Sequence, residues 1–511
     1  MDGLARLRQP RGSHQRTQRV YPIEPTPDPA SLRRLAIDRP ELFPALFDTV
    51  TPGPRHRYTI LAAFPEGVLR RLGNGRLAVE GAAPRVGSAA GDHSFLDALD
   101  HWWMDEGAEG AAGPHTPGDA GAATPAAPLT ATPVPRLPFR GGWVLYLGYE
   151  LAAEIEPTLV LPALPPQATC AAAIRVRGAI VLDHAESRAW FTSEAGTDEA
   201  AGQLQLIMQA LAKPEACKHM DAAVPPARQG APAQAEPGAP PTEDELAFRD
   251  AVLEAQRHIA AGDIYQANLS RPWCLPMPAG TGLAEAYRRL CATNPAPFAA
   301  IARASDAWLL SSSPERLVRV LGDVVETRPI AGTRRRQGGE GDESEQRELL
   351  ANPKERAEHV MLIDLERNDL GRVCEAGSVV VDEFMVTESY PHLHHIVSNV
   401  RGRLRPDATP AAVLRAVFPG GTITGCPKHR CMQVIGDLER EPRGAYTGSV
   451  GYLNTDGDMD FNILIRTATL SGSELRFRAG AGIVADSDWQ RELAETRTKA
   501  EGLLRAFGAR A

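Results

Sequence analysis

The sequence predicts an α+β fold in which antiparallel β-sheets carry helices on their outer faces. Strand-like apolar runs follow one another through short turns, a pattern that favours antiparallel pairing. Helical stripes of apolar residues are confined to a few longer segments that can cover such sheets. At 511 residues, the chain is long enough to bury the cores of two or three domains.

The first half of the chain is predicted to form a β-rich domain over residues 21–212. Its clearest strands are 142–151 and 171–182, and the second is rich in Ile and Val. Residues 1–20 contain arginines but no apolar core, so we expect a disordered basic tail rather than a secretory signal. Residues 107–138 consist largely of Ala, Gly, Pro and Thr, and we expect them to be a mobile insertion.

A linker rich in Pro and Ala is predicted at residues 213–241, and a catalytic domain follows over residues 242–511. Thr242 and Glu245 have the spacing of a capping box, which starts a helix. The strands expected in this domain are 308–312, 379–381, 448–453, 459–470 and 475–484. The further helices expected are 353–369, 426–438 and 489–507.

Charge and cysteine content exclude several classes of function. The net charge is −9 and no stripe of Lys and Arg runs through the body of the chain, so we expect no nucleic-acid partner. No apolar run approaches the roughly 20 residues that a membrane helix needs, so we expect no membrane association. The seven cysteines are scattered and form no CxxC pair, which indicates reduced thiols and a cytoplasmic location.

Two familiar motifs are absent from the sequence. Residues 420–428, GGTITGCPK, differ from a phosphate-binding loop because no Ser or Thr follows the lysine. No cysteine lies in a GxCxG elbow, the arrangement of a glutamine-hydrolysing nucleophile. Any ammonia that the protein uses must therefore come from elsewhere.

Charged residues on two predicted helices are candidate magnesium ligands. Glu358 lies on the first helix, and Glu492, Glu495 and Lys499 lie on the C-terminal helix, where offsets of three and seven place them on one face. Each of them taken alone is more simply a solvated side chain or part of a surface ion pair. Together, glutamates from two helices could supply the one or two carboxylates that Mg²⁺ uses alongside substrate oxygens and water.

Arg466 is a guanidinium within the apolar run FNILIRTATL, which we expect to be a buried strand. A buried arginine needs an anionic partner, which can be a structural carboxylate or a ligand. Gly480 and Gly482 would let backbone N–H groups approach an anion closely. With the glutamates, these residues describe a pocket for a small dianionic substrate held by magnesium.

These residues fall in runs that resemble the chorismate-utilising enzymes. The matching runs are GDIYQANLSR (262–271), SSSPERL (311–317), TRPIAGTRRR (327–336), NPKERAEHVMLIDLERNDLGRVC (352–374), HHIVSNVRG (394–402), FPGGTITGCPK (418–428) and RAGAGIVADS (478–487). The resemblance is dense over residues 243–508 and is continued more thinly by GGWVLYLGYELA (141–152). It implies an anthranilate synthase component I-like fold, with two large packed antiparallel β-sheets flanked by outer helices.

The resemblance implies a magnesium-bound substrate. Glu358 and Glu495 would ligate Mg²⁺, which would in turn hold the ring carboxylate of chorismate, and Glu492 would support them from the same helix face. Arg466 and Tyr446 would bind the enolpyruvyl carboxylate.

Other matched residues would complete the anion site or act in catalysis. Backbone amides near Gly480 and Gly482 would join the ammonium group of Lys499 around the substrate, and Gly332 and Thr424 would line the pocket. The residues with implied catalytic roles are Glu315, the general acid that protonates the departing ring hydroxyl, His395, which would assist binding or proton transfer, and Lys499. An acid must be protonated at the working pH, so we expect burial to raise the pKa of Glu315.

Gln266 indicates which nucleophile attacks the substrate. Family members that add water have lysine at this position, so the glutamine implies amination by ammonia from a separate glutamine amidotransferase subunit. Amination at ring carbon 4 gives aminodeoxychorismate, on the way to p-aminobenzoate and folate, whereas amination at carbon 2 with loss of pyruvate gives anthranilate, on the way to tryptophan. GDIYQANL, HHIVS and FPGGTITGCPK resemble the folate branch, which we favour.

Ala331 in PIAGT departs from the lysine of many folate-branch enzymes and is typical of anthranilate synthases, which keeps the second reaction open. A third alternative is a chorismate-binding regulatory relative without catalysis. Residues 45–49 do not match the strand that helps feedback-inhibited anthranilate synthases to bind tryptophan, so we do not expect feedback inhibition by tryptophan.

Overall fold

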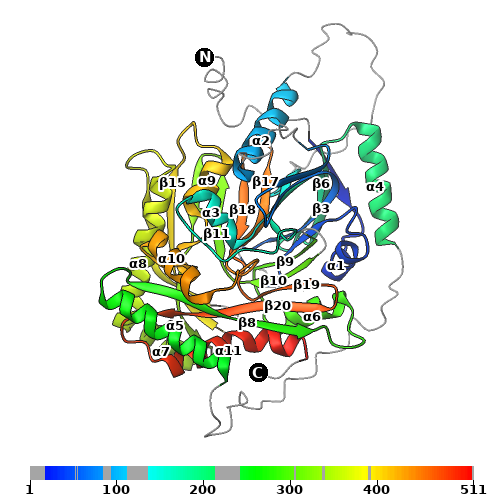
Figure 1. Cartoon of the computed structure of the whole chain (residues 1–511). Helices are drawn as coiled ribbons and strands as arrows, with labels where there is room; N and C mark the ends of the chain where they lie inside the picture. The colour runs from blue at the N-terminus through cyan, green and yellow to red at the C-terminus, as the bar shows by residue number, and fades with distance from the viewer. Residues whose placement is uncertain are drawn as a thin grey trace, which may run out of the picture.

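The α+β fold class predicted from the sequence is confirmed by a computed structural model of the chain (Figure 1). The structure describes residues 18–51, 53, 56–83, 94–111, 136–212, 242–303, 307–336, 340–389 and 393–508. In this part of the chain, no helix is long and apolar enough to cross a membrane.

The strands alternate with helices along the chain, and most are short. The strands are β1 (Arg19–Ile23), β2 (Ala45–Asp48), β3 (Tyr58–Leu72), β4 (Leu77–Gly81), β5 (Gly142–Leu147), β6 (Thr169–Asp183), β7 (Arg188–Ser193), β8 (Gln266–Pro276), β9 (Phe298–Arg303), β10 (Trp308–Ser313), β11 (Arg316–Leu321), β12 (Val324–Thr327), β13 (Ile330–Arg335), β14 (Val380–Ser389), β15 (Leu393–Arg403), β16 (Gly425–Cys426), β17 (Ser449–Asn454), β18 (Met459–Asn462), β19 (Thr467–Ser471) and β20 (Glu474–Ile483). The helices are α1 (Pro29–Asp38), α2 (Phe95–Ala111), η2 (Tyr149–Leu151), α3 (Ala152–Ile155), α4 (Thr197–Leu211), α5 (Glu243–Ala260), α6 (Leu283–Thr293), α7 (Glu340–Ala351), α8 (Pro353–Gly371), α9 (Pro410–Val417), η3 (Gly421–Ile423), α10 (Lys428–Glu439) and α11 (Trp489–Ala506).

The described strands are joined into one continuous antiparallel network rather than two separate sheets. The long strands β3 and β6 pair with each other at its centre. One arm continues from β6 through β5, β17, β18, β11, β12 and β15, and the other continues from β3 through β2, β9, β10, β19, β20 and β8. The two sheets expected from the sequence are therefore two arms of a single sheet.

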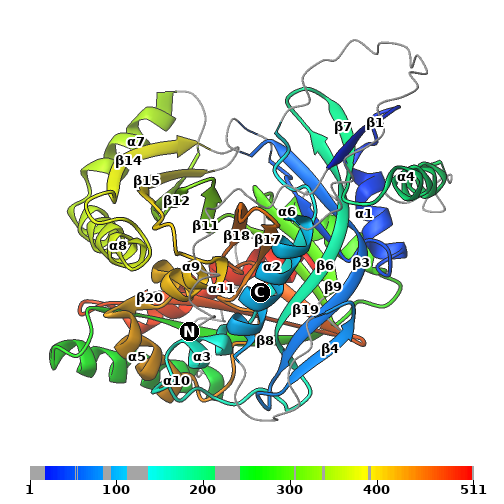
Figure 2. The same ribbon diagram turned by 90° about the horizontal axis from the view of Figure 1, so that it is seen from above.

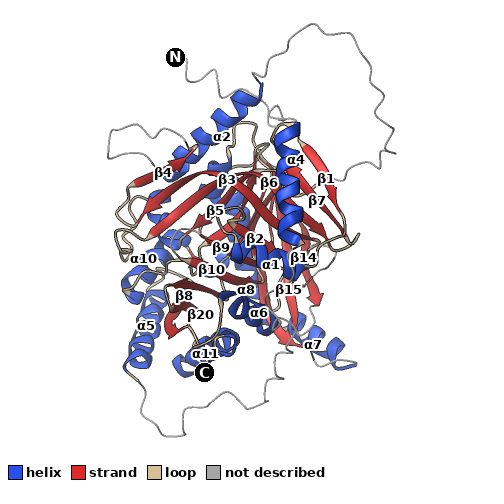
Figure 3. Ribbon diagram, turned by 90° about the vertical axis from the view of Figure 1, so that its right-hand side faces the viewer, coloured by secondary structure: helices blue, strands red, loops and turns tan. Residues whose placement is uncertain are grey.

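The arms pack on each other through an inner apolar layer and carry helices on their outer sides (Figures 2 and 3). In the inner layer, the rings of Phe47 on β2 and Tyr452 on β17 lie 5.5 Å apart and join the two arms. Helices α2, α8 and α9 pack against the outer side of the first arm. Helices α1, α6 and α11 pack against the outer side of the second arm. Both faces of the sheet are thereby removed from water, and this burial of apolar surface is the main contribution to the stability of the fold.

Local capping chemistry starts the helices near the expected positions. Thr242 and Glu245 form the predicted capping box of α5. Helix α11 begins at Trp489, as expected, and Asp488 caps it by accepting a hydrogen bond from the Arg491 backbone. The Ser487 hydroxyl before it donates to Glu492.

Several expected boundaries differ from the structure. Strand β1 begins at Arg19, within the last two residues of the expected tail 1–20, because it pairs with β7. Helix α2 continues to Ala111, five residues into the expected insertion 107–138. The rest of the tail up to residue 17, residues 112–135 and the linker 213–241 lie outside the described residues.

Phe461 on β18 is 1% exposed in the outer apolar layer under α9. We expect Phe461→Ala to lower the free energy of unfolding by about 3–5 kcal/mol, because it removes a buried ring and leaves a cavity. Urea unfolding followed by far-UV circular dichroism measures the change. Leu321→Ala on the neighbouring β11 is the control, since Leu321 is 50% exposed. Equal losses for the two variants would contradict the described layer.

Candidate active site

Helices α8 and α11 bring acidic side chains to the start of β8. The Gln266 side-chain nitrogen donates to Glu358 Oε1 over 3.4 Å, which joins β8 to α8. On α11, Lys499 Nζ pairs with Glu495 Oε1 at 2.7 Å and donates to the Gly480 carbonyl at 3.0 Å. The negative charge of Glu495 raises the pKa of Glu358 and the positive charge of Lys499 lowers it, so α11 lies close to this carboxyl. Two distant segments of the chain therefore converge here.

The carboxylates gathered here have the chemistry of a site for a divalent cation. Burial raises the pKa of Glu358, and the negative charges of Glu355 and Glu495 raise it further. Such a group of carboxylates is stabilised by a divalent cation. No three His, Cys, Asp or Glu side chains of the described residues could enclose a metal by themselves. Mg²⁺ suits this arrangement because it needs only one or two protein carboxylates besides other oxygens.

Glu492 lies one turn before Glu495 but has a different contact. Its Oε1 accepts a hydrogen bond from the Ser487 hydroxyl at 2.7 Å. The same hydroxyl accepts from the Val484 backbone at 3.0 Å, so Glu492 helps to fix the connection between β20 and α11.

Glu315 is a buried carboxyl in the connection between β10 and β11. Its carbonyl accepts from the Ile463 backbone at 3.0 Å, which holds the connection against the turn after β18. Burial raises the pKa of Glu315 to about 7, although the Thr422 hydroxyl and the positive charges of Lys499 and Arg466 oppose the rise. Its Oε1 has no hydrogen-bond partner among the described residues. The expected raised pKa is present, and a proton-donating role suits this carboxyl.

Arg466 lies in a turn and not on a continuous strand as expected. Strand β18 ends at Asn462 and β19 begins at Thr467, and Arg466 between them has a φ of 50°, in the left-handed region. Burial lowers its pKa, and Glu315 is the carboxylate whose charge opposes this. Within the described ranges, no ion pair joins Arg466 to a carboxylate. Its guanidinium can therefore bind an anionic ligand.

His395 on β15 lies close enough to Arg466 for that charge to change its pKa. A hydrogen bond joins it to the backbone of Gly332, which has a φ of 64° at an irregularity in β13. Burial and the charge of Arg466 lower the pKa of His395 to about 4, so the ring is neutral at neutral pH. The preceding His394 contacts Gln346 of α7 at 3.2 Å. Only the second histidine therefore faces the site, as the alternation along a strand predicts.

Gly480 and Gly482 lie on β20 where side chains cross it closely. A Cβ at Gly480 would lie 2.7 Å from the Tyr446 hydroxyl, and a Cβ at Gly482 would lie 2.7 Å from the Gln266 side-chain nitrogen. Glycine is required at Gly480, because a Cβ there would also lie 2.7 Å from the Leu269 backbone carbonyl, whereas at Gly482 a Cβ would meet only the flexible end of Gln266. Thr424 is also close, since its carbonyl accepts from the Asn268 backbone on β8 at 3.0 Å. Its own hydroxyl donates to the Gly420 carbonyl at 3.0 Å, and the residue is fully buried, so the hydroxyl stabilises the backbone of η3.

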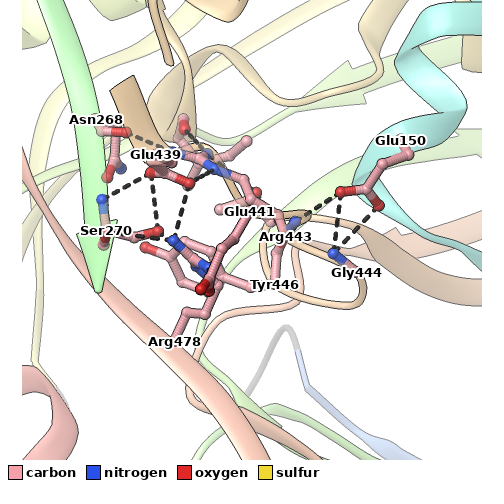
Figure 4. Close-up of polar contacts among 11 residues, drawn as sticks. Glu150, Asn268, Ser270, Glu439, Glu441, Arg443, Gly444, Tyr446 and Arg478 are labelled. Carbon is pink, nitrogen blue, oxygen red and sulfur yellow. Dashed lines mark hydrogen bonds and ion pairs between the residues drawn. The ribbon is translucent and has the colours of Figure 1, made fainter. Parts of the chain in front are cut away.

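A buried charge network supports Tyr446, and it was not expected from the sequence (Figure 4). Glu439 at the end of α10 accepts from the Ser270 backbone at 2.8 Å, from Arg443 at 2.6 Å and from Arg478 at 3.1 Å. The two arginines hold the pKa of Glu439 below its usual range despite full burial. The Arg443 guanidinium lies 5.5 Å from the centre of the Tyr446 ring. The network thus fixes the wall that carries Tyr446.

The N-terminal half of the chain contributes Glu150 to the same wall. Its carboxylate accepts from the Arg443 backbone at 2.6 Å and from the Gly444 backbone (Figure 4). The run GGWVLYLGYELA contains this residue, and it was the signal that could have indicated the contact. For the network around Glu439, the only sign in the sequence is Arg443, which follows four residues later.

Comparison with known proteins places these residues in a family. A family model described as chorismate binding enzyme matches residues 106–505. An anthranilate synthase component I-like protein of Synechocystis is 41% identical over 383 residues, which are 74% of this chain and 75% of the relative. Aminodeoxychorismate synthase component 1 of Bacillus subtilis is 40% identical over 372 residues, which are 72% of this chain and 77% of the relative.

A solved structure supports the same relationship. Anthranilate synthase component I from Streptococcus pneumoniae matches with a TM-score of 0.69 and 29% identity, over 89% of this chain and 94% of that one. The family match spans most of the sequence and contains Gln266, Glu315, Glu358, His395 and Glu495. The chain belongs to the chorismate-binding enzyme family.

Proposed function

We propose that the chain is the large subunit of an aminodeoxychorismate synthase, which aminates chorismate at ring carbon 4 with ammonia from a separate glutamine amidotransferase subunit. The observation that carries the proposal is the convergence of Glu358, Glu495 and Lys499 near Gln266. Glu315 lies close enough to Lys499 and Arg466 for both charges to lower its pKa. This arrangement has acidic groups for a metal, cations for a dianion and a protonated carboxyl for the leaving hydroxyl.

Each group has a definite task in the proposed reaction. Glu358 and Glu495 would hold Mg²⁺, whose charge would neutralise the ring carboxylate of chorismate. Arg466 and Tyr446 would bind the enolpyruvyl carboxylate, and Lys499 would add positive charge beside it. Glu315 would give its proton to the departing hydroxyl. Gln266 would line the path of the nucleophile without taking a proton, as suits attack by ammonia.

Anthranilate synthesis is the second candidate, and Ala331 favours it. Ala331 is 7% exposed on β13 and provides no nucleophile for a covalent intermediate at carbon 2. Relatives at similar identity are named after both activities. The runs GDIYQANL and FPGGTITGCPK support the folate branch.

A product assay separates the two reactions. We expect the protein with chorismate, Mg²⁺ and ammonium to yield p-aminobenzoate only after a lyase for aminodeoxychorismate is added. Glutamine in place of ammonium should give no product until the amidotransferase subunit is present. Anthranilate fluorescence without a lyase would show that carbon 2 is aminated. Absence of turnover with both ammonium and the complete complex would favour a regulatory relative.

We expect Glu358→Gln to raise the Mg²⁺ concentration for half-maximal activity at least about tenfold, because it removes one of two metal carboxylates. Activity titrations with Mg²⁺ at saturating chorismate measure the change. Asp364→Asn is the matched control on α8, since that carboxylate is 65% exposed and pairs with Arg367. The magnesium role of Glu358 is wrong if the two variants titrate alike.

We expect Glu315→Gln to lower kcat by about 100-fold or more, as loss of a general acid does, with little change in chorismate affinity. In the unsubstituted protein, activity should fall as pH rises through about 7, because the acid must be protonated and its pKa is raised to about 7. Initial rates at constant free ammonia and calorimetric binding of chorismate check both points. Full activity of Glu315→Gln would remove its role.

A further inference from the structure

Glu366 on α8 is a second buried carboxyl close to Glu315. Both carboxyls line one narrow crevice. Thr327 at the end of β12 and Thr422 in η3 also line this crevice. Glu366 is 6% exposed and Glu315 is also 6% exposed, so water has little access to either group.

Polar atoms around the crevice have unused hydrogen-bonding capacity. Glu315 Oε1 and the hydroxyls of Thr327 and Thr422 are buried without a hydrogen-bond partner among the described residues. The Thr422 hydroxyl lies close enough to the Glu315 carboxyl to lower its pKa, and the Thr327 hydroxyl lowers the pKa of the Glu366 carboxyl in the same way. A Cβ added at Gly421 would lie 3.2 Å from Glu366 Oε1, which places this carboxyl beside the residue that precedes Thr422. Buried hydroxyls can both accept and donate a proton.

Charges of both signs act on the ionisation of Glu366. Asp369 on the same helix and Glu315 disfavour its ionised form, and Lys428 on α10 favours it. Lys428 forms an ion pair with Asp369, so its charge is shared. The crevice also has Arg316 and Arg328 in its lining. Arg316 binds Asp460 at 2.8 Å, and Arg328 binds Glu383 and Glu388 at 2.7 Å, so both arginines are engaged elsewhere.

We propose that Glu366 is a positioning residue for the proton of Glu315: the two carboxyls share one proton across the crevice through the hydroxyls of Thr327 and Thr422. The inference rests on the proposed function, in which Glu315 is the acid. Burial raises the pKa of both carboxyls to about 7, and the charges of Asp369 and Glu315 add to the rise at Glu366.

The proposed step conserves atoms and protons. The O–H bond of Glu315 breaks, its proton joins the ring hydroxyl, and the C–O bond breaks with its electron pair to release water. The donated proton is the one that the two carboxyls share: it reaches Glu315 from Glu366 through the hydroxyls before the transfer, and both carboxyls are ionised after it. The lone pair of ammonia forms the C–N bond, and the resulting ammonium loses one proton, which returns to the carboxyl pair. The net change is ammonia plus an alcohol to an amine plus water.

Glu366→Gln tests the sharing, because it keeps the side-chain volume and removes the titratable group. A coupled pair loses its two protons in separate steps, and Glu315 stays partly protonated until the second proton leaves. With glutamine at 366, Glu315 loses its proton in one step at lower pH. In the profile of kcat against pH, we expect the fall at high pH, the alkaline limb, to occur roughly one pH unit lower. We also expect kcat at the optimum to fall about tenfold, with KM for chorismate unchanged.

Further variants separate this effect from simple destabilisation. Glu366→Asp keeps a titratable group and should restore the position of the limb. Thr327→Val breaks the path but keeps both carboxyls, so kcat should fall while the limb stays in place. Glu326→Gln on the same strand as Thr327 is the control, since Glu326 binds Arg319 at 2.8 Å outside the crevice. Its limb should match that of the unsubstituted protein.

The outcomes distinguish the two levels of inference. A lower melting temperature of Glu366→Gln with an unmoved alkaline limb would assign Glu366 to the core alone and overturn the sharing. An inactive Glu315→Gln beside a Glu366→Gln variant with unchanged kcat and unchanged limb would also overturn it, while leaving the acid in place. An active Glu315→Gln would instead remove the proposed function on which the inference rests.

Discussion

The cost of keeping carboxylates away from water is the constraint on which this site depends. Glu439 is fully buried but meets two arginines and the Ser270 backbone, so its ionised form is stabilised and its pKa is lowered. Glu315 is buried and Glu358 is half-buried with fewer compensating charges, and their pKa values are raised. A carboxylate that meets two arginines is thus kept ionised, whereas the two that meet fewer cations are shifted toward their protonated forms.

The pairing of β8 with β20 converts this electrostatic arrangement into a defined geometry. The register places Gly480 opposite Ser270 and Gly482 opposite Asn268, so the Glu439 network and the wall of the pocket share one pair of strands. Lys499 is tied to the Gly480 carbonyl, which fixes α11 against β20. A shift of the register by one residue would turn these side chains to the other face of the sheet. The position of the acidic group therefore follows from strand pairing.

Much of the fold could be predicted because its signals are local. The capping box at Thr242 and the helix carrying Glu358 lie where the sequence indicated. The turn at Arg466 could not be predicted, because the run FNILIRTATL contains no Gly or Pro and its apolar residues resemble one strand. The burial of Glu439 could not be predicted, since its second arginine, Arg478 on β20, is brought near only by tertiary packing. Partners of buried charges are rarely visible in a single sequence.

Under the proposed reaction, the entering nucleophile must be ammonia and not ammonium, because only the neutral form has a lone pair that can attack carbon. The site offers no strong base that would make ammonia from ammonium: Gln266 is an uncharged amide, and burial and the charge of Arg466 lower the pKa of His395 to about 4. Neutral ammonia needs no base before it attacks. Delivery of ammonia by a separate subunit, protected from protonation in bulk water, is therefore the supply that these residues favour.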